Sequence, residues 1–218
     1  MVDYTIARRN MVESQIRPNK VTDPLLLAAL LELPREQFLP KARRGVAYVD
    51  EDIEVGEGRY LMEPMVLARL LLAAEVKPTD IVLDIGCATG YSTAVLARLA
   101  NTVVAVESSR KLAAEATAVL SQLGIDNAAV IEGPLDKGYA KQGPYDVILF
   151  SGAIAQVPDA ILDQLADGGR LVAVIDDGSR VRKGTIMTRL GGVISGRAVF
   201  DAATPLLPGF DRKPGFVF

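Results

Sequence analysis

Residues 80–107 constrain the fold more than any other part of the chain, because they predict a strand, a turn, a helix and a second strand in succession. Residues 81–85 form an apolar run rich in β-branched side chains, which indicates a parallel strand buried on both faces. Residues 86–90 carry almost no side-chain bulk, so the backbone can turn sharply and a ligand can approach it closely. Residues 91–100 have helical periodicity, and residues 103–106 predict a second buried strand.

The second strand ends in a carboxylate, Glu107. An acidic side chain about 20 residues beyond a glycine turn can accept hydrogen bonds from both ribose hydroxyls of a nucleoside. The turn itself reads Asp84-x-Gly86-x-Ala88-x-Gly90, which differs from the glycine spacing of dinucleotide-binding folds. We therefore expect a nucleoside site, and a tight turn in some other α/β protein is the alternative.

This turn resembles the first motif of class I S-adenosylmethionine (SAM) methyltransferases. The resemblance implies that Asp84 orients the loop around the amino-acid end of SAM and that Glu107 binds the ribose. It also implies an α/β, Rossmann-like fold whose seven-stranded, mostly parallel sheet has helices on both faces and its last strand reversed. An N-terminal helical extension precedes this core.

The apolar pattern from residue 80 onward alternates between strands and helices. It predicts strands at 81–85, 103–106, 128–132, 145–151 and 170–175, helices at 91–100, 109–123 and 158–166, and a hairpin within 184–200. Before residue 75 it predicts short helices, including 6–16, 25–33 and 65–74. We expect a single domain, 1–218, in which residues 1–75 cover the methyl acceptor and residues 76–218 bind SAM. Two Pro-Gly-Phe tripeptides, at 208–210 and 214–216, favour a frayed end.

Composition excludes several kinds of chemistry. The chain has no histidine and one cysteine, which rules out His-based catalysis and internal disulfides, and we expect no metal site. Cys87 is interpreted as a small residue in a crowded turn rather than as a nucleophile. The net charge of −3 disfavours nucleic-acid binding. With no apolar run near the roughly 20 residues that span a bilayer and no signal peptide, we expect a soluble, cytoplasmic protein that does not bind membranes.

A longer series of motifs, in the same order, resembles the protein-L-isoaspartate O-methyltransferase family. The segments are 11–16, 21–24, 33–40, 58–64, 82–97, 143–146 and 162–170. The resemblance implies methyl esterification of isoaspartyl carboxylates in damaged proteins, with SAM as cofactor and S-adenosylhomocysteine (SAH) as product. The residues it places at the cofactor are Asp84, Gly86, Cys87, Ala88, Gly90, Tyr91, Glu107, Gly133, Pro134, Leu135 and Ser151.

The acceptor segment departs from the family's Thr-Ile-Ser-Ala-Pro signature. Met62 stands at the serine and Glu63 at the alanine, while Met65 replaces a histidine after the proline. Losing a hydroxyl removes a hydrogen bond to a charged acceptor, typically about 1.5 to 3 kcal/mol. Tyr60, Met62 and Glu63 are the candidate acceptor-site residues, although core packing explains Tyr60, Met62 and Met65 equally well.

Three functions therefore remain open. The first is repair of isoaspartyl proteins or peptides, and the second is SAM-dependent methylation of another acceptor, either a small molecule or a different protein site. The third is a SAM-binding partner module without turnover. Transfer to a carboxylate needs no proton removal, whereas an amine or phenol would want a base, for which Glu63, Asp146 and Tyr60 are available.

Overall fold

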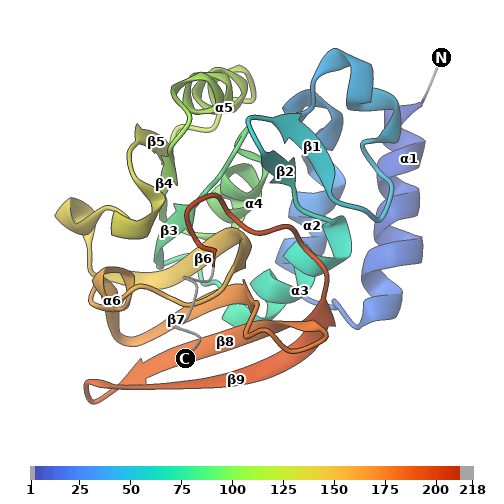
Figure 1. Ribbon diagram of the computed structural model, residues 1–218. Helices are drawn as coiled ribbons and strands as arrows, with labels where there is room; N and C mark the ends of the chain where they lie inside the picture. The colour runs from blue at the N-terminus through green and yellow to red at the C-terminus, as the bar shows by residue number, and fades with distance from the viewer. Residues whose placement is uncertain (1–2, 212–218) are drawn as a thin grey trace, which may run out of the picture.

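The computed structural model describes residues 3–211, and its centre is a seven-stranded sheet in the order β5-β4-β3-β6-β7-β8-β9 (Figure 1). The strands are β3 (Ile81–Ile85), β4 (Thr102–Glu107), β5 (Ala128–Glu132), β6 (Tyr145–Ile154), β7 (Leu165–Ile175), β8 (Arg182–Leu190) and β9 (Val193–Ala202). The first five run parallel, and β8 is antiparallel to both of its neighbours.

The reversed strand is β8, the sixth, so the expectation that the last strand is reversed is wrong. Only residues 176–181 separate β7 from β8, and a connection this short joins neighbouring strands antiparallel. The β8–β9 turn contains Gly191 and Gly192, both with positive φ, and it makes the second antiparallel pair. The predicted hairpin is thereby confirmed, and β9 lies at the edge of the sheet.

Side chains alternate across the sheet, as expected of strands buried on both faces. Val82 belongs to a core cluster that includes residues of α2 (Pro24–Glu32), α3 (Pro64–Ala74), α4 (Tyr91–Leu99) and α5 (Arg110–Gln122). Leu83 and Ile85 belong to a cluster on the other face, which includes residues of α6 (Asp159–Leu162) and of the C-terminal segment. The predicted fold, a mostly parallel sheet with helices on both faces, is confirmed.

The helix predicted at 158–166 is only one turn long, because Gln164 ends it. Its amide nitrogen donates to the carbonyls of Lys137 and Ala160, and its amide oxygen accepts from the backbone N–H of Tyr139. The Gln164 carbonyl accepts from the Tyr145 N–H at 2.8 Å, so the chain has already joined the sheet. Strand β7 therefore begins at Leu165, five residues earlier than predicted.

The N-terminal region contains α1 (Tyr4–Met11), extended by a π-helical turn (Val12–Ile16), and α2, whose first turn is capped by Asp23. Short 3-10 segments lie at Arg17–Asn19, Arg35–Phe38, Lys41–Val46, Leu135–Lys137 and Ala140–Gln142. The sequence did not predict the small hairpin of β1 (Ile53–Gly56) and β2 (Arg59–Leu61). Its turn uses Glu57 and Gly58, both with positive φ.

The first Pro-Gly-Phe tripeptide is packed rather than frayed, which corrects the expectation. Phe210 is buried and makes an edge-to-face contact with Phe150, with ring centroids 5.5 Å apart. The second tripeptide, at 214–216, lies outside the described residues. Within residues 3–211, no helix is long and apolar enough to cross a membrane.

Candidate active site

The loop after β3 turns through three residues with positive φ, namely Gly86 (+79°), Ala88 (+49°) and Gly90 (+93°). A Cβ on Gly86 would lie 2.7 Å from Nη2 of Arg59, and a Cβ on Gly90 would lie 3.1 Å from the Cβ of Ala116. The turn therefore needs glycine both for its backbone angles and for the close approach of neighbouring groups.

Asp84 ties this loop to the two elements beside it. Its buried carboxylate accepts hydrogen bonds of 2.7 Å from the hydroxyls of Ser92 and Thr93 on α4 and of Ser151 on β6. Burial raises the pKa of Asp84, and these hydroxyls act in the opposite direction. Asp84, which was predicted to orient the loop, therefore fixes the start of the loop against α4 and β6. The role of Asp84 toward SAM stays a prediction.

Glu107 is fully buried at the end of β4. Its Oε2 accepts from the Ala88 N–H at 2.8 Å, and its Oε1 accepts from the Ser109 N–H at 3.0 Å and the Ser108 hydroxyl at 3.3 Å. Nη2 of Arg59 lies 3.4 Å from Oε2. The carboxylate predicted for ribose binding is therefore surrounded by four donor groups.

Arg59 reaches this carboxylate from β2. Side chains alternate along a strand, so Arg59 and Leu61 point to the buried side of the hairpin while Tyr60 stays half-buried. The Arg59 side chain is 2% exposed, its Nη2 also donates to the Gly86 carbonyl, and its Nη1 has no hydrogen-bond partner within the described part of the chain. Arg59 was not predicted as a site residue, and its one signal in the sequence is a charged residue at the start of an otherwise apolar strand.

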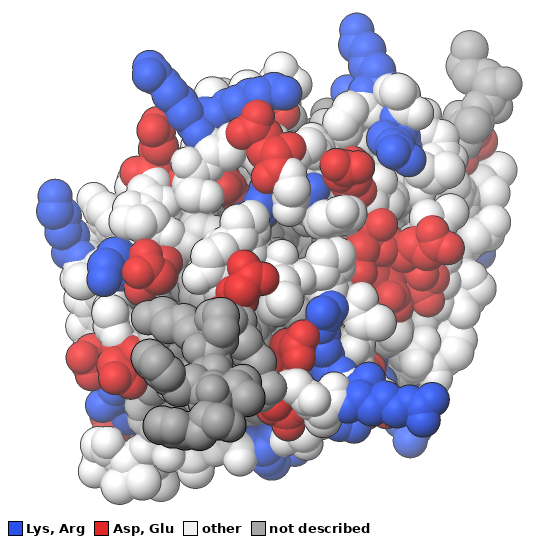
Figure 2. Space-filling model, viewed as in Figure 1, with Lys and Arg blue, Asp and Glu red and all other residues white. Residues whose placement is uncertain are grey.

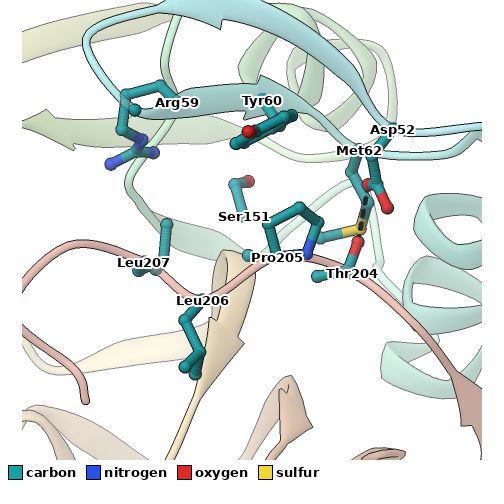
Figure 3. Close-up of a pocket in the computed structure, with 11 residues that line it drawn as sticks. Asp52, Arg59, Tyr60, Met62, Ser151, Thr204, Pro205, Leu206 and Leu207 are labelled. Carbon is teal, nitrogen blue, oxygen red and sulfur yellow. Dashed lines mark hydrogen bonds between the residues drawn. The ribbon is translucent and has the colours of Figure 1, made fainter.

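Two small cavities, of about 10 Å³ each, lie on either side of Tyr60 and Met62. Each has room for about one water molecule. Figure 3 shows the first, with Arg59 and Leu207 at one end, Asp52, Met62 and Thr204 at the other, and Tyr60 and Ser151 between. The second is lined by Tyr60, Leu61, Met62, Leu67, Gly86, Cys87, Tyr91, Ser92 and Ser151.

The end of the first cavity at Met62 combines an apolar wall with a hydroxyl–carboxylate pair. Met62 is 5% exposed and lines both cavities. Beside it, the Thr204 hydroxyl donates to Asp52 Oδ1 at 2.7 Å (Figure 3). The Glu63 N–H donates to the same oxygen at 3.0 Å. Burial raises the pKa of Asp52. Asp52, Thr204 and Leu207 were not predicted from the sequence as site residues.

The Glu63 side chain lines neither cavity, unlike Tyr60 and Met62. Its burial, together with the charges of Asp50, Asp52 and Glu51, raises its pKa to about 7. Figure 2 shows acidic side chains gathered on the face of the molecule that carries the β1–β2 hairpin.

The backbone at Met62, just after β2, is held by a buried cation, Arg35. Its Nε donates to the Ala47 carbonyl and its Nη2 to the Met62 carbonyl, both at 2.8 Å. Its guanidinium also stacks on the Tyr91 ring, 4.8 Å from the centroid, and Phe38 contacts the same ring edge-on at 5.3 Å. Tyr91 therefore joins the N-terminal region to the core, besides lining the second cavity.

The remaining predicted residues are placed as follows. Gly133, Pro134 and Leu135 line neither cavity; the Gly133 N–H donates to the Glu107 carbonyl, and Leu135 packs in the core. Cys87 is buried, and burial raises the pKa of its thiol well above the usual value, so the thiol stays protonated. This agrees with the interpretation of Cys87 as a small packing residue.

Two hydrogen-bond acceptors of this site suit a nucleoside, namely the buried Glu107 carboxylate and the Gly86 carbonyl. They lie at the glycine loop, at the carboxyl ends of parallel strands. The cavities are too small for a nucleoside, since pockets for small ligands usually enclose about 300 to 1,000 Å³. The side chains of Arg59 and Leu207 fill the end of the site beside the glycine loop.

The family model described as "Protein-L-isoaspartate(D-aspartate) O-methyltransferase (PCMT)" matches residues 7–197. The chain belongs to this family. The predicted family and the class of SAM-dependent methyltransferases are thereby confirmed. The match includes β2, the glycine loop and most of the sheet, so it covers the acceptor segment as well as the cofactor residues.

Curated relatives of this PCMT-family chain carry the same description. The "Protein-L-isoaspartate O-methyltransferase" of Koribacter versatilis is 37% identical over 79% of this chain and 78% of that protein. The one from Methanoculleus marisnigri is 39% identical over 77% of this chain and 76% of that protein.

Solved structures show the same fold. One named protein-L-isoaspartate O-methyltransferase superimposes with a TM-score of 0.79 at 28% identity, over 93% of this chain and 66% of that one. A putative family member from Plasmodium falciparum, in complex with S-adenosyl-L-homocysteine, gives a TM-score of 0.78 at 19% identity, over 95% of this chain and 99% of that one. The Rossmann-like fold predicted for this chain is confirmed.

Proposed function

We propose that this chain transfers the methyl group of SAM to the side-chain carboxylate of isoaspartyl residues in damaged proteins or peptides. The observation that carries the proposal is the family match over residues 7–197, which includes the glycine loop, Glu107 and the segment of Tyr60 and Met62. Relatives that are 37 to 39% identical bear the name of this activity, and one solved family member holds SAH.

The residues proposed to hold SAM are those around the glycine loop. Gly86, Ala88 and Gly90 let the backbone approach the ligand, Asp84 fixes the base of the loop, and Glu107 supplies the acceptor for ribose hydroxyls. We also propose that residues 1–75 cover the acceptor side of residues 76–218, with the β1–β2 hairpin as the contact element.

The acceptor chemistry asks little of the protein in this reaction. A carboxylate oxygen takes the methyl group directly, the sulfonium becomes a neutral thioether, and no proton has to move. A site without histidine and without a free thiolate suits such a transfer. Tyr60, Met62 and Thr204 would then act by positioning the acceptor rather than by acid–base catalysis.

One observation favours a second candidate function, methylation of a different acceptor. The hydroxyl expected near the acceptor carboxylate is replaced by the Met62 thioether, and the first cavity, which Met62 lines, also contains the Asp52–Thr204 pair. A buried carboxylate beside an apolar wall fits an acceptor that carries a proton, such as an amine or a hydroxyl, better than it fits another carboxylate.

The test is methyl transfer from labelled SAM to an isoaspartyl peptide and to its normal aspartyl twin, with SAM binding measured on the same sample. Labelling of the isoaspartyl peptide alone supports the proposal. Binding of SAM without labelling contradicts it and favours another acceptor or a module without turnover.

Met62→Ser distinguishes the reason for such a failure. It should raise kcat/KM for the isoaspartyl peptide about 10- to 100-fold, because the restored hydroxyl donates to a charged acceptor. Met187→Ser, which makes the same exchange on β8 away from both cavities, is the matched control.

A further inference from the structure

The acceptor sites of Glu107 are occupied or blocked by groups of the protein. A carboxylate offers about four lone-pair sites; three accept hydrogen bonds from the Ala88 N–H, the Ser109 N–H and the Ser108 hydroxyl, and the Arg59 guanidinium forms an ion pair at 3.4 Å with Oε2 beside the fourth. The two amides belong to the backbone and cannot leave. Two ribose hydroxyls can therefore be accepted only in place of the two side-chain donors, Ser108 and Arg59.

Arg59 also takes the other acceptor at the glycine loop, the Gly86 carbonyl. Its side chain is 2% exposed, so the guanidinium lies within the site rather than at its mouth. Leu207 closes the same space from the opposite side, since a Cβ on Gly86 would lie 3.0 Å from it and a Cβ on Gly152 only 2.5 Å (Figure 3). Two backbone hydrogen bonds of 2.8 Å, Ala153 to Pro205 and Leu207 to Ala153, hold that segment against β6.

We propose that Arg59 determines the specificity of the cofactor site: its guanidinium competes with SAM for Glu107 and, by its charge, makes the site favour SAH over SAM. The proposal rests on the proposed function in taking SAM as the cofactor. A nucleoside binds only molecules in which Arg59 has moved away from Glu107. Its apparent affinity is the affinity of that form multiplied by the fraction of molecules in it. Any nucleoside ligand bears this reduction.

The charge of Arg59 adds a second effect that separates the two ligands. β2 pairs with β1, so a displaced guanidinium stays tethered close to the site. The sulfur of SAM is a cation and that of SAH is neutral, and like charges repel strongly where water is excluded. Product is therefore retained more firmly than cofactor, which makes turnover sensitive to the removal of SAH.

Isothermal titration of the full chain with SAM and with SAH tests this directly. In Arg59→Gln we expect SAM to bind at least about tenfold more tightly than in wild type, and the preference for SAH to fall at least about threefold. Leu207→Ala opens the same space without changing charge, so both ligands should gain equally. Arg98→Gln, at a surface ion pair with Glu32, should change neither affinity.

Thermal unfolding without ligand checks that the variants fold, and Arg59→Met is the substitute if Arg59→Gln does not. Unchanged or weaker SAM binding on removing Arg59, or an equal gain for both ligands, would overturn the proposal. If no variant binds either ligand, SAM is not the cofactor and the proposed function fails too. If wild type binds and Arg59 makes no difference, only this inference fails.

Discussion

Arg59 and Glu107 should be strongly coupled in stability, because both charges are buried and lie against each other. Both side chains are at most 2% exposed, and their charged atoms are 3.4 Å apart. Removing one partner of a buried pair typically costs about 3 to 5 kcal/mol, since the other charge is left without compensation. We expect a loss of this size for Glu107→Gln, which keeps the shape of the side chain and removes its charge.

Arg59→Met should cost less, about 2 kcal/mol, because Glu107 keeps its two amide donors and mainly the Gly86 carbonyl loses a partner. The double variant contains neither charge. It should therefore be at least about 1.5 kcal/mol more stable than the sum of the two single losses predicts.

Urea unfolding at pH 7.5, followed by far-UV circular dichroism, measures all four free energies, and equal m-values ensure that the differences are comparable. The control cycle uses Arg98→Met and Glu32→Gln, an exposed pair at 2.9 Å whose coupling should stay below about 1 kcal/mol. If the coupling of the buried pair does not exceed that of the exposed pair, Arg59 is not the counter-charge of Glu107 and the reasoning is refuted.

Three further predictions concern the acceptor side. The folded pKa of Glu63, about 7, lies above its ordinary 4.5, so the stability it contributes is complete below pH 4.5 and is lost as pH rises through 7. Glu63→Gln should therefore raise the free energy of unfolding at pH 8 and not at pH 4, by less than about 1 kcal/mol after screening, as measured by urea unfolding; an equal effect at both pH values contradicts this. Thr204→Val should cost about 1 to 1.5 kcal/mol in urea unfolding, because Asp52 loses a buried donor; a neutral result would show that the 2.7 Å bond contributes nothing. An isoaspartyl peptide flanked by lysines should have a KM several-fold below that of one flanked by glutamates, with the difference vanishing in 0.5 M salt, because Asp50, Glu51 and Glu63 lie near the acceptor end; equal KM values at low salt would refute this.

The sequence predicted the sheet well where pattern and chemistry agreed. Residues 81–85 are β3, and the glycine turn and Glu107 lie together as expected, because a buried parallel strand, a turn without side chains and a terminal carboxylate each have a local signature. The helix at 158–166 was wrong because its length is decided by Gln164, whose three side-chain hydrogen bonds are tertiary contacts without a local pattern.

The site was harder to predict than the fold. Asp52, Arg59 and Thr204 come from β2 and from segments about 150 residues apart in the chain, and they meet only because the hairpin and the tail converge over β6. The predicted site residues did not include Arg59. Only the alternation of the hairpin, which the sequence did not reveal, turns it inward.

The contact of Arg35 with Met62 bears on how the sequence at position 62 can change during evolution. Arg35 binds the backbone carbonyl of Met62, a group that every amino acid possesses, and not the side chain. A new residue at position 62 inherits the same backbone position, so the wall can change what it recognises while its shape persists. In such a protein, a change of methyl acceptor requires substitution of side chains that line the cavity and no change of backbone. Such substitutions can accumulate one at a time while the protein stays folded.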